Sequence, residues 1–167
     1  MSVSETAAAS AESTSLLSEK QSIHIDAPVD TVWRVAGDYS DLTWVPAVKG
    51  SSATRGYEPG SHRTLDFGGV LFTETLIAYD SSRHSYTYAI DDTAANHTVA
   101  PLADLVATIS VASDGKGGSI ATWEATFRRV DASATPAPDK DDAAARKRMA
   151  ATISSGLNGL KVKVNAH

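Results

Sequence analysis

The segment "DAAARKRMAATISSGLNGLKVKV" runs from Asp142 to Val164 near the end of the chain, and it constrains the architecture more than any other part of the sequence. It is the one long helical pattern in the sequence, and acidic residues stand at its start, where the helix dipole favours them. Its apolar residues recur every three or four positions and form one stripe: Met149, Ile153, Leu157, Leu160 and Val164. A helix with such a stripe must bury it against another layer of the protein.

The preceding part of the chain predicts that this other layer is a sheet. Between Val48 and Val130, turn signals such as "YEPGS", "DSSR", "DDTAAN" and "SDGKGG" recur about every ten residues, and the runs between them are rich in β-branched and aromatic residues. This pattern predicts an antiparallel meander of about six strands. Leu16 to Ile25 adds a first strand, and "PVDTVWRVAGDY" and "SDLTWVP" predict two short helices after it. The predicted fold is therefore α+β, with a seven-stranded antiparallel sheet that buries the stripe of the long helix on its concave face.

The composition fits one soluble domain. The chain has 167 residues and 42% hydrophobic content, enough for a core without metals or disulfides, and it contains no cysteine. Its net charge of -5 argues against nucleic acid as a partner, and no apolar run approaches the roughly 18 residues of a membrane span. Residues 1–15 are small and polar and lack the basic and apolar regions of a secretory signal. We therefore predict a disordered tail at 1–15, a single domain at 16–167 and, by default, a cytoplasmic location.

A hairpin around "DFGGVLFTETL" places a carboxylate in the middle of an apolar strand. A two-residue Gly-Gly turn would pair the flanking residues in this order: Phe67 with Val70, Leu65 with Phe72, and Arg63 with Glu74. Most of these side chains are apolar, so their shared face is predicted to point inward. A buried carboxylate is costly unless it is paired. Either Arg63 and Glu74 form a structural ion pair, or Glu74 faces a cavity that uses it.

Two further strands carry large side chains on one face. "RHSYTYAI" alternates, so His84, Tyr86, Tyr88 and Ile90 are predicted to point inward. The two tyrosines either offer hydroxyl groups to a ligand oxygen or fill a wide core. In "ATWEATF", the same alternation places the aromatic residues inside and Glu124 outside.

Several classes of chemistry have no motif in the sequence. There is no Gly-rich phosphate loop, no HExxH and no GxSxG, and the five histidines show no metal-ligand spacing. We therefore predict neither a metal nor another cofactor. Gly156 and Gly159 interrupt the long helix, and they either leave room for a ligand beneath it or are incidental to its packing.

The order of these elements resembles a known superfamily. Together with "IDAPVDTVWRVAGDYSDLTWVPAV", "EPGSHRTL", "FTETLIAYDSSRHSYTYAI" and "PLADLVATISV", it is similar to the START-like or birch-pollen-allergen-like superfamily, and most to its bacterial polyketide cyclase/dehydrase branch. The resemblance covers Ser18 to about Lys161. It implies a helix-grip fold, in which the curved sheet wraps the C-terminal helix around a deep apolar cavity. It also implies a hydrophobic small molecule as the ligand.

The resemblance further implies which residues face that cavity. In the plant abscisic acid receptors, which look like distant relatives, a strand glutamate followed by a leucine two residues on lines the cavity, and "TETL" places Glu74 there. The same comparison places Tyr88 and Ile90 on the wall and turns Glu124 inward, against the alternation; a β-bulge would reconcile the two. The cavity lysine of those receptors is missing here, and their gate and latch read "FGGV" and "APL". These departures argue against a hormone-receptor role and leave Arg63 as the expected contact for an anion.

These expectations give one leading function and two alternatives. The leading function is a cyclase, dehydratase or lyase acting on an aromatic or polyketide-type carbonyl compound, with Glu74 as general acid/base, Arg63 beside it and Tyr88 as donor to a developing enolate oxygen. The other expected substrate contacts are Trp44 and His62 at the mouth, and Leu65, Phe67, Phe72, Tyr86, Ile90, Leu105, Glu124, Ile153, Gly156 and Leu157. The alternatives are a non-catalytic carrier of a hydrophobic molecule and a chaperone-like partner of another enzyme. Either a monomer or a homodimer is expected.

Overall fold

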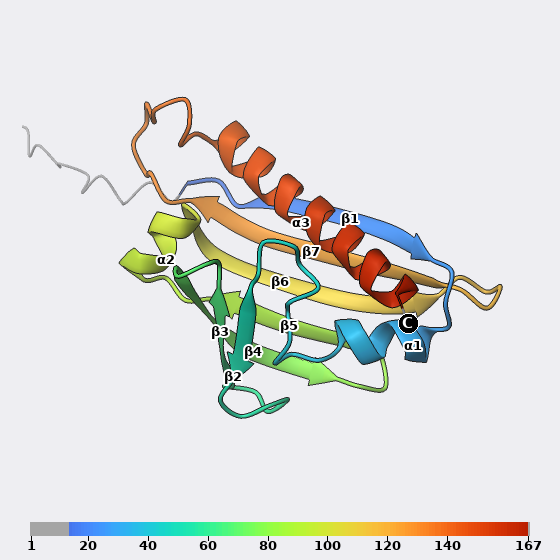
Figure 1. Cartoon of the computed structure of the whole chain (residues 1–167). Helices are drawn as coiled ribbons and strands as arrows, with labels where there is room; N and C mark the ends of the chain where they lie inside the picture. Colours follow the sequence, from blue (N-terminus) through green and yellow to red (C-terminus); the bar gives the residue numbers. More distant parts are fainter. Residues whose placement is uncertain (1–13, 167) are drawn as a thin grey trace, which may run out of the picture.

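The computed structural model describes residues 14–166 and shows one antiparallel sheet crossed by a long helix (Figure 1). In chain order the elements are β1 (Leu17–Ile25), α1 (Val29–Ala36), β2 (Gly50–Ala53), β3 (His62–Asp66), β4 (Leu71–Asp80), β5 (Ser85–Ile90), α2 (Ala94–Val99), β6 (Leu102–Ser113), β7 (Ser119–Arg129) and α3 (Asp142–Asn165). The sheet has seven strands in the order β1-β7-β6-β5-β4-β3-β2, which confirms the predicted helix-grip architecture. Residues 1–13 of the predicted tail lie outside the described residues.

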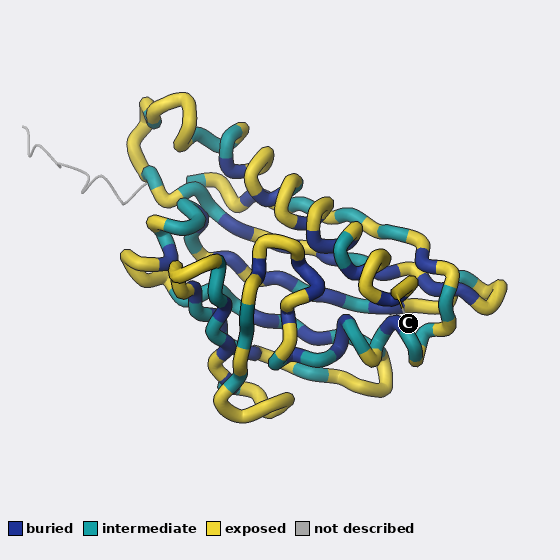
Figure 2. Tube along the Cα trace, in the orientation of Figure 1, coloured by how far each residue is buried: buried dark blue, intermediate teal, exposed yellow. Residues whose placement is uncertain are grey.

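α3 lies across β1 and β7 and buries its apolar stripe against them (Figure 1). The helix begins after Asp141, whose Oδ1 accepts a hydrogen bond from the Ala144 amide at 2.8 Å. Figure 2 shows the buried positions of α3 on the side that faces the sheet. They include the whole predicted stripe: Met149, Ile153, Leu157, Leu160 and Val164. The periodicity of the sequence therefore identified the correct face of the helix.

The two glycines of α3 allow close packing. A Cβ at Gly156 would overlap the indole ring of Trp123 on β7, and one at Gly159 would overlap the backbone oxygen of Trp44. The glycines thus let α3 approach β7 and the loop that follows α1. The space beneath Gly156 is filled by protein, so the expectation that it contacts a ligand is wrong.

The β3–β4 hairpin has the predicted register. Gly68 and Gly69 have φ angles of 92° and 97°, which glycine adopts without a Cβ clash. The Phe67 amide donates to the Val70 oxygen at 2.9 Å, so the turn has two residues. The pairs that follow are Leu65 with Phe72 and Arg63 with Glu74. Only Val70 departs from the predicted inward face, because it lies at the hairpin tip and is 51% exposed.

Two local predictions are wrong. The segment "SDLTWVP" forms successive turns in place of a second helix, with the Val45 amide bonded to the Leu42 oxygen at 3.0 Å and the Val48 amide to the Val45 oxygen at 2.9 Å. Conversely, "DDTAAN" was read as a turn, but it begins α2 because the Thr93 hydroxyl accepts from the Asn96 amide at 3.1 Å and caps the helix.

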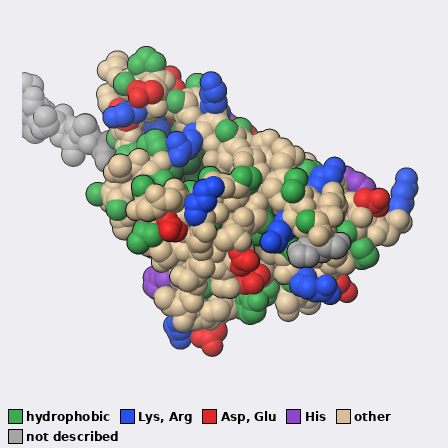
Figure 3. Space-filling model, in the orientation of Figure 1, with side chains coloured by type: hydrophobic (Ala, Val, Ile, Leu, Met, Phe, Trp, Pro, Cys, Tyr) green, Lys and Arg blue, Asp and Glu red, His purple; other side chains and the backbone are tan. Residues whose placement is uncertain are grey.

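The surface mixes charges of both signs. On the face seen in Figure 3, basic and acidic side chains are interspersed, and no broad patch of one sign is visible there. Within residues 14–166, no helix is both long and apolar enough to cross a membrane.

Candidate functional site

A cavity of about 460 Å3 lies between α3 and the concave face of the sheet. Its size falls in the range of about 300–1,000 Å3 that is typical of small-molecule sites. The loop after α1, the connection from α2 to β6, and α3 form the walls that face the sheet. Five of the apolar residues predicted as ligand contacts line the sheet side: Leu65, Phe67, Phe72, Ile90 and Leu105. An apolar ligand would therefore be enclosed mainly by aliphatic and aromatic side chains.

The mouth of the cavity is marked by its exposed lining residues, which are Ala47, Arg148, Ala151, Thr152 and Ser155. Arg148 bridges this opening, because its Nη2 donates to the backbone oxygen of Val99 at 2.7 Å. The bond connects α3 to the end of α2 on the opposite side. The mouth is thus more polar than the walls behind it.

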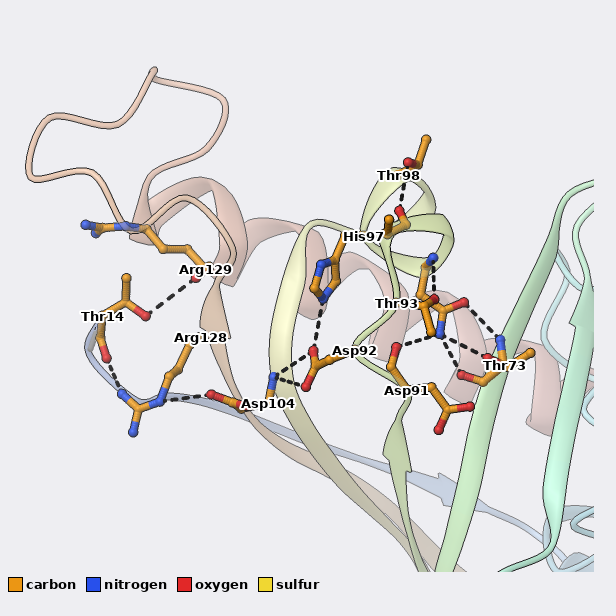
Figure 4. A network of polar contacts seen from close by, with 12 residues as sticks. Thr14, Thr73, Asp91, Asp92, Thr93, His97, Thr98, Asp104, Arg128 and Arg129 are labelled. Carbon is orange, nitrogen blue, oxygen red and sulfur yellow. Dashed lines mark hydrogen bonds and ion pairs between the residues drawn. The ribbon is translucent and has the colours of Figure 1, made fainter. Parts of the chain in front are cut away.

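A network of hydrogen bonds holds α2 in place beside the mouth (Figure 4). Asn96 is 2% exposed, and its Oδ1 accepts from the Thr73 amide at 3.0 Å while its Nδ2 donates to the Thr73 oxygen at 2.8 Å. On the other side of α2, His97 Nε2 lies 2.9 Å from Asp92 Oδ1, and Asp92 accepts from the Asp104 amide at the start of β6. Val99 and Ala100, which follow these anchors, line the cavity. The network therefore fixes the position of one wall.

The buried end of the cavity carries three polar side chains: Glu74, Tyr88 and Trp123. Glu74 sits on β4 and is 2% exposed. Directly behind it lies Arg63, which is 0% exposed and bonds to the carboxylate twice, from Nε to Oε1 at 3.1 Å and from Nη2 to Oε2 at 3.3 Å. The cross-strand pairing predicted from the turn thus produces a bidentate, fully buried ion pair.

The guanidinium group of Arg63 also directs its other N–H donors and its planar faces to groups within the protein. Its Nη1 donates to the Tyr39 backbone oxygen at 3.1 Å and to the Tyr86 hydroxyl at 3.2 Å. Its Cζ lies 4.3 Å from the ring centre of Tyr39 and 4.8 Å from that of Tyr88, which are cation–π distances. Arg63, the expected contact for a ligand anion, is fully buried and is not among the residues that line the cavity.

The charges of this pair depend on each other. Burial raises the pKa of Glu74, and the charge and hydrogen bonds of Arg63 oppose that rise. Burial would lower the pKa of Arg63, but Glu74 and the neighbouring tyrosines raise it, and the net shift is upward. A buried cation needs a counter-ion. Arg63 therefore remains charged, and it holds Glu74 as the carboxylate that compensates it.

Other predicted contacts lie away from the cavity lining. Tyr86 is buried behind the wall, where its hydroxyl accepts from Arg63. Ile153 and Leu157 are buried in the core beneath α3. Trp44 is 4% exposed and packs edge-on against Trp123, with ring centres 5.8 Å apart. It is part of the buried core and is not among the residues that line this cavity.

The two predicted contacts that carry charge or a titratable ring face outward. His62 is exposed at the start of β3, and its Nδ1 lies 3.1 Å from the Thr75 hydroxyl. Glu124 points away from the concave face, with its side chain 52% exposed and 3.9 Å from Lys20. The alternation in β7 was therefore right, and the inward placement that the resemblance suggested was wrong.

Four parts of the cavity were missed in the sequence, and one of them is the loop after α1, which contributes Leu42, Val45, Ala47 and Val48. Trp123 was placed on the inner face by alternation, but it was not proposed as a contact, since aromatic residues on an inner face usually belong to the core. Arg148, Thr152 and Ser155 flank the apolar stripe of α3 and looked like ordinary solvent-facing positions. The wall formed by Val99 and Ala100 was missed because "DDTAAN" was predicted to be a turn, so α2, which carries that wall, was not expected.

Comparisons with known proteins agree with this architecture. A family model described as "Polyketide cyclase / dehydrase and lipid transport" matches residues 18–165. Among solved structures, an uncharacterised protein from Bacillus thuringiensis aligns with a TM-score of 0.73 at 24% identity, covering 89% of this chain and 99% of that one. Protein XoxI from Bacillus cereus gives 0.73 at 23% identity, covering 89% and 95% of the two chains. Ara h 8.0201 gives 0.68 at 15% identity, covering 92% and 100%.

At these identities the solved structures show a shared fold and nothing finer. The comparison with curated proteins gives no match. The family match over residues 18–165 nevertheless spans nearly all of the sheet and the long helix.

Proposed function

Because the chain belongs to the polyketide cyclase/dehydrase and lipid transport family, we propose that its cavity binds an aromatic or polyketide-type carbonyl compound. The observation that carries this proposal is a cavity of about 460 Å3 with apolar walls and a few polar groups gathered at its buried end. The apolar body of such a ligand would pack on the walls. Its oxygen would lie near Glu74 and Tyr88.

The proposed function has two forms, and in the first the protein is an enzyme in which Glu74 is catalytic. The carboxylate lines the cavity, and its oxygens offer about four acceptor positions, of which Arg63 takes two. Glu74 would remove a proton from the carbon next to the carbonyl, and the Tyr88 hydroxyl would donate to the resulting enolate oxygen. The enolate would then expel a β-hydroxyl group, which leaves as water with the proton that Glu74 took up. Arg63 would position Glu74 without touching the substrate.

The second form is a carrier that binds the same compound without changing it. The bidentate pairing of Arg63 and Glu74 favours this form, because both carboxylate oxygens already have strong partners. The pair would then serve to close the buried end of the cavity. Binding is common to both forms, and turnover separates them.

The test uses the aldol adduct of benzaldehyde and acetone, a β-hydroxy ketone that loses water to give benzylideneacetone. Catalysis by Glu74 predicts that Glu74→Gln slows this dehydration by about 100-fold or more while the protein stays folded. Glu124→Gln is the matched control, since it makes the same change on the outer face, and it should leave the rate unchanged. Saturable binding of the adduct without product would favour the carrier. Absence of binding would refute the proposed function itself.

A further inference from the structure

The indole of Trp123 carries a buried N–H group that has no acceptor at hydrogen-bonding geometry among the described residues. Trp123 is 3% exposed, and its Nε1 makes no hydrogen bond with any residue in the range 14–166. The ring edge formed by Cε3, Cζ3 and Cη2 packs over Gly156 on α3, and Nε1 lies on the opposite side of the ring. The same side chain lines the cavity. An unpaired donor is therefore built into a wall that is otherwise mostly apolar.

Such a donor is unusual enough to need a physical reason. Leaving a buried N–H without an acceptor costs about 1–3 kcal/mol, and most buried polar groups in proteins are satisfied. Trp44 has the same property, because its Nε1 also lacks an acceptor among the described residues. Trp44, however, does not line this cavity. Of these two tryptophans, only Trp123 lines the cavity proposed to bind the ligand.

The Tyr88 hydroxyl is the second donor at this place. Burial raises the pKa of Tyr88 well above its usual value, the charge of Glu74 adds to the rise, and the charge of Arg63 opposes it. The hydroxyl thus stays protonated, and Tyr88 lines the same cavity as Trp123. Tyr86 differs, since its hydroxyl is occupied by Arg63 at 3.2 Å. One N–H donor, on Trp123, and one O–H donor, on Tyr88, therefore belong to lining residues at the buried end of the cavity.

Resting on the proposed function, we propose that Trp123 Nε1 and the Tyr88 hydroxyl together hold one uncharged acceptor oxygen of the ligand, such as that of a ketone or quinone. A hydrocarbon of the same shape would leave both donors unpaired. A carboxylate would meet the negative charge of Glu74, and the Arg63 donors that could compensate it are bound to Glu74, Tyr39 and Tyr86. The pair thus selects a neutral carbonyl group over both alternatives.

The experiment compares fluorenone with fluorene, two flat molecules that differ by a carbonyl oxygen in place of two hydrogens. Dissociation constants are measured by calorimetry for the wild type, Trp123→Phe and Trp44→Phe. Two hydrogen bonds predict that the wild type binds fluorenone about 10-fold or more tightly than fluorene, and that Trp123→Phe reduces this preference by about 5-fold. Trp44→Phe is the matched control, because it makes the same change in the neighbouring ring of the edge-on pair, and it should keep the preference.

An infrared measurement separates hydrogen bonding from packing. The carbonyl stretch of bound fluorenone should lie at lower wavenumber in the wild type than in Trp123→Phe or Tyr88→Phe, and a merely structural tryptophan would not move it. If Trp123→Phe does not fold, the inference is still tested by two measurements on the wild type: the infrared band of bound fluorenone and the dissociation constants of fluorenone and fluorene. If both ligands bind equally and the band is not shifted, the inference is overturned while the binding function stands. If neither ligand binds, the proposed function fails and the inference fails with it.

Discussion

Replacing Arg63 by methionine removes the counter-ion of a carboxylate that has almost no access to water. Glu74 is 2% exposed, and both of its oxygens accept hydrogen bonds from Arg63. Removing one partner of such a buried pair costs about 3–5 kcal/mol, and the Tyr39 oxygen and Tyr86 hydroxyl lose a donor as well. Since whole domains are stable by only about 5–15 kcal/mol, Arg63→Met should lie near the limit of folding.

The assay is urea unfolding followed by tryptophan fluorescence. Arg55→Met is the matched control, because Arg55 pairs with Glu58 at 3.4 Å on the surface with side chains 62% and 69% exposed. That change should alter the free energy of unfolding by no more than about 1 kcal/mol. The double variant Arg63→Met, Glu74→Leu should regain most of the lost stability, because no unpaired charge then remains in the core.

The pH dependence gives an independent check on the same variant. Without Arg63, nothing opposes the rise that burial causes in the pKa of Glu74 above its ordinary value of 4.5. A carboxyl group with a raised pKa in the folded state contributes stability below pH 4.5 that is lost as the pH rises through the folded pKa. Arg63→Met should therefore unfold more easily at pH 7 than at pH 4.5. If Arg63→Met lowers the free energy of unfolding by less than about 1 kcal/mol at both pH values, Arg63 and Glu74 are not held as a buried ion pair.

Four further predictions concern the packing and the remaining polar groups. Gly156→Ala should lower the free energy of unfolding by about 1–3 kcal/mol because its Cβ overlaps Trp123, and an unchanged melting temperature would mean that the ring moves freely. Leu157→Ala should lose about 2–5 kcal/mol, whereas no loss in urea unfolding would place the stripe on the wrong face. All five tyrosines have raised pKa values, so a spectrophotometric titration should show less tyrosinate at pH 10 in the folded protein than after unfolding in urea; equal ionisation of the two states at that pH would contradict the raised pKa values. Asn96→Ala should speed hydrogen exchange in α2 without affecting β7. Equal protection of α2 in this variant and in the wild type would show that the remaining hydrogen bonds are enough to hold the helix in place.

The sequence predicted features that depend on local patterns. The Gly68–Gly69 turn is local, and once its length is known the pairing of Arg63 with Glu74 follows by counting along two strands. The alternation around Tyr88 and Glu124 likewise gives the correct faces. Each of these predictions needs only neighbours in the chain or across one turn.

The sequence did not predict what lies opposite each residue across the core. Gly156 looked like a source of free space because the ring of Trp123, which fills that space, lies 33 positions earlier in the chain. Arg63 looked like a ligand contact because its bonds to Tyr39 and Tyr86 come from segments that no turn relates to it. Long-range packing decides both roles, and neither periodicity nor alternation encodes it.

The pairing of β1 with β7 has a consequence for the order of folding during synthesis. Leu17 lies opposite Phe127 and Ile25 opposite Ser119. The first strand to be synthesised, β1, therefore pairs with the last one, β7. The meander from β2 to β6 can close through neighbouring strands as it emerges, whereas β1 has no partner until β7 has left the ribosome. α3 follows later still and completes the cavity. A small molecule can therefore stabilise only the finished chain, and it acts on the last step of folding.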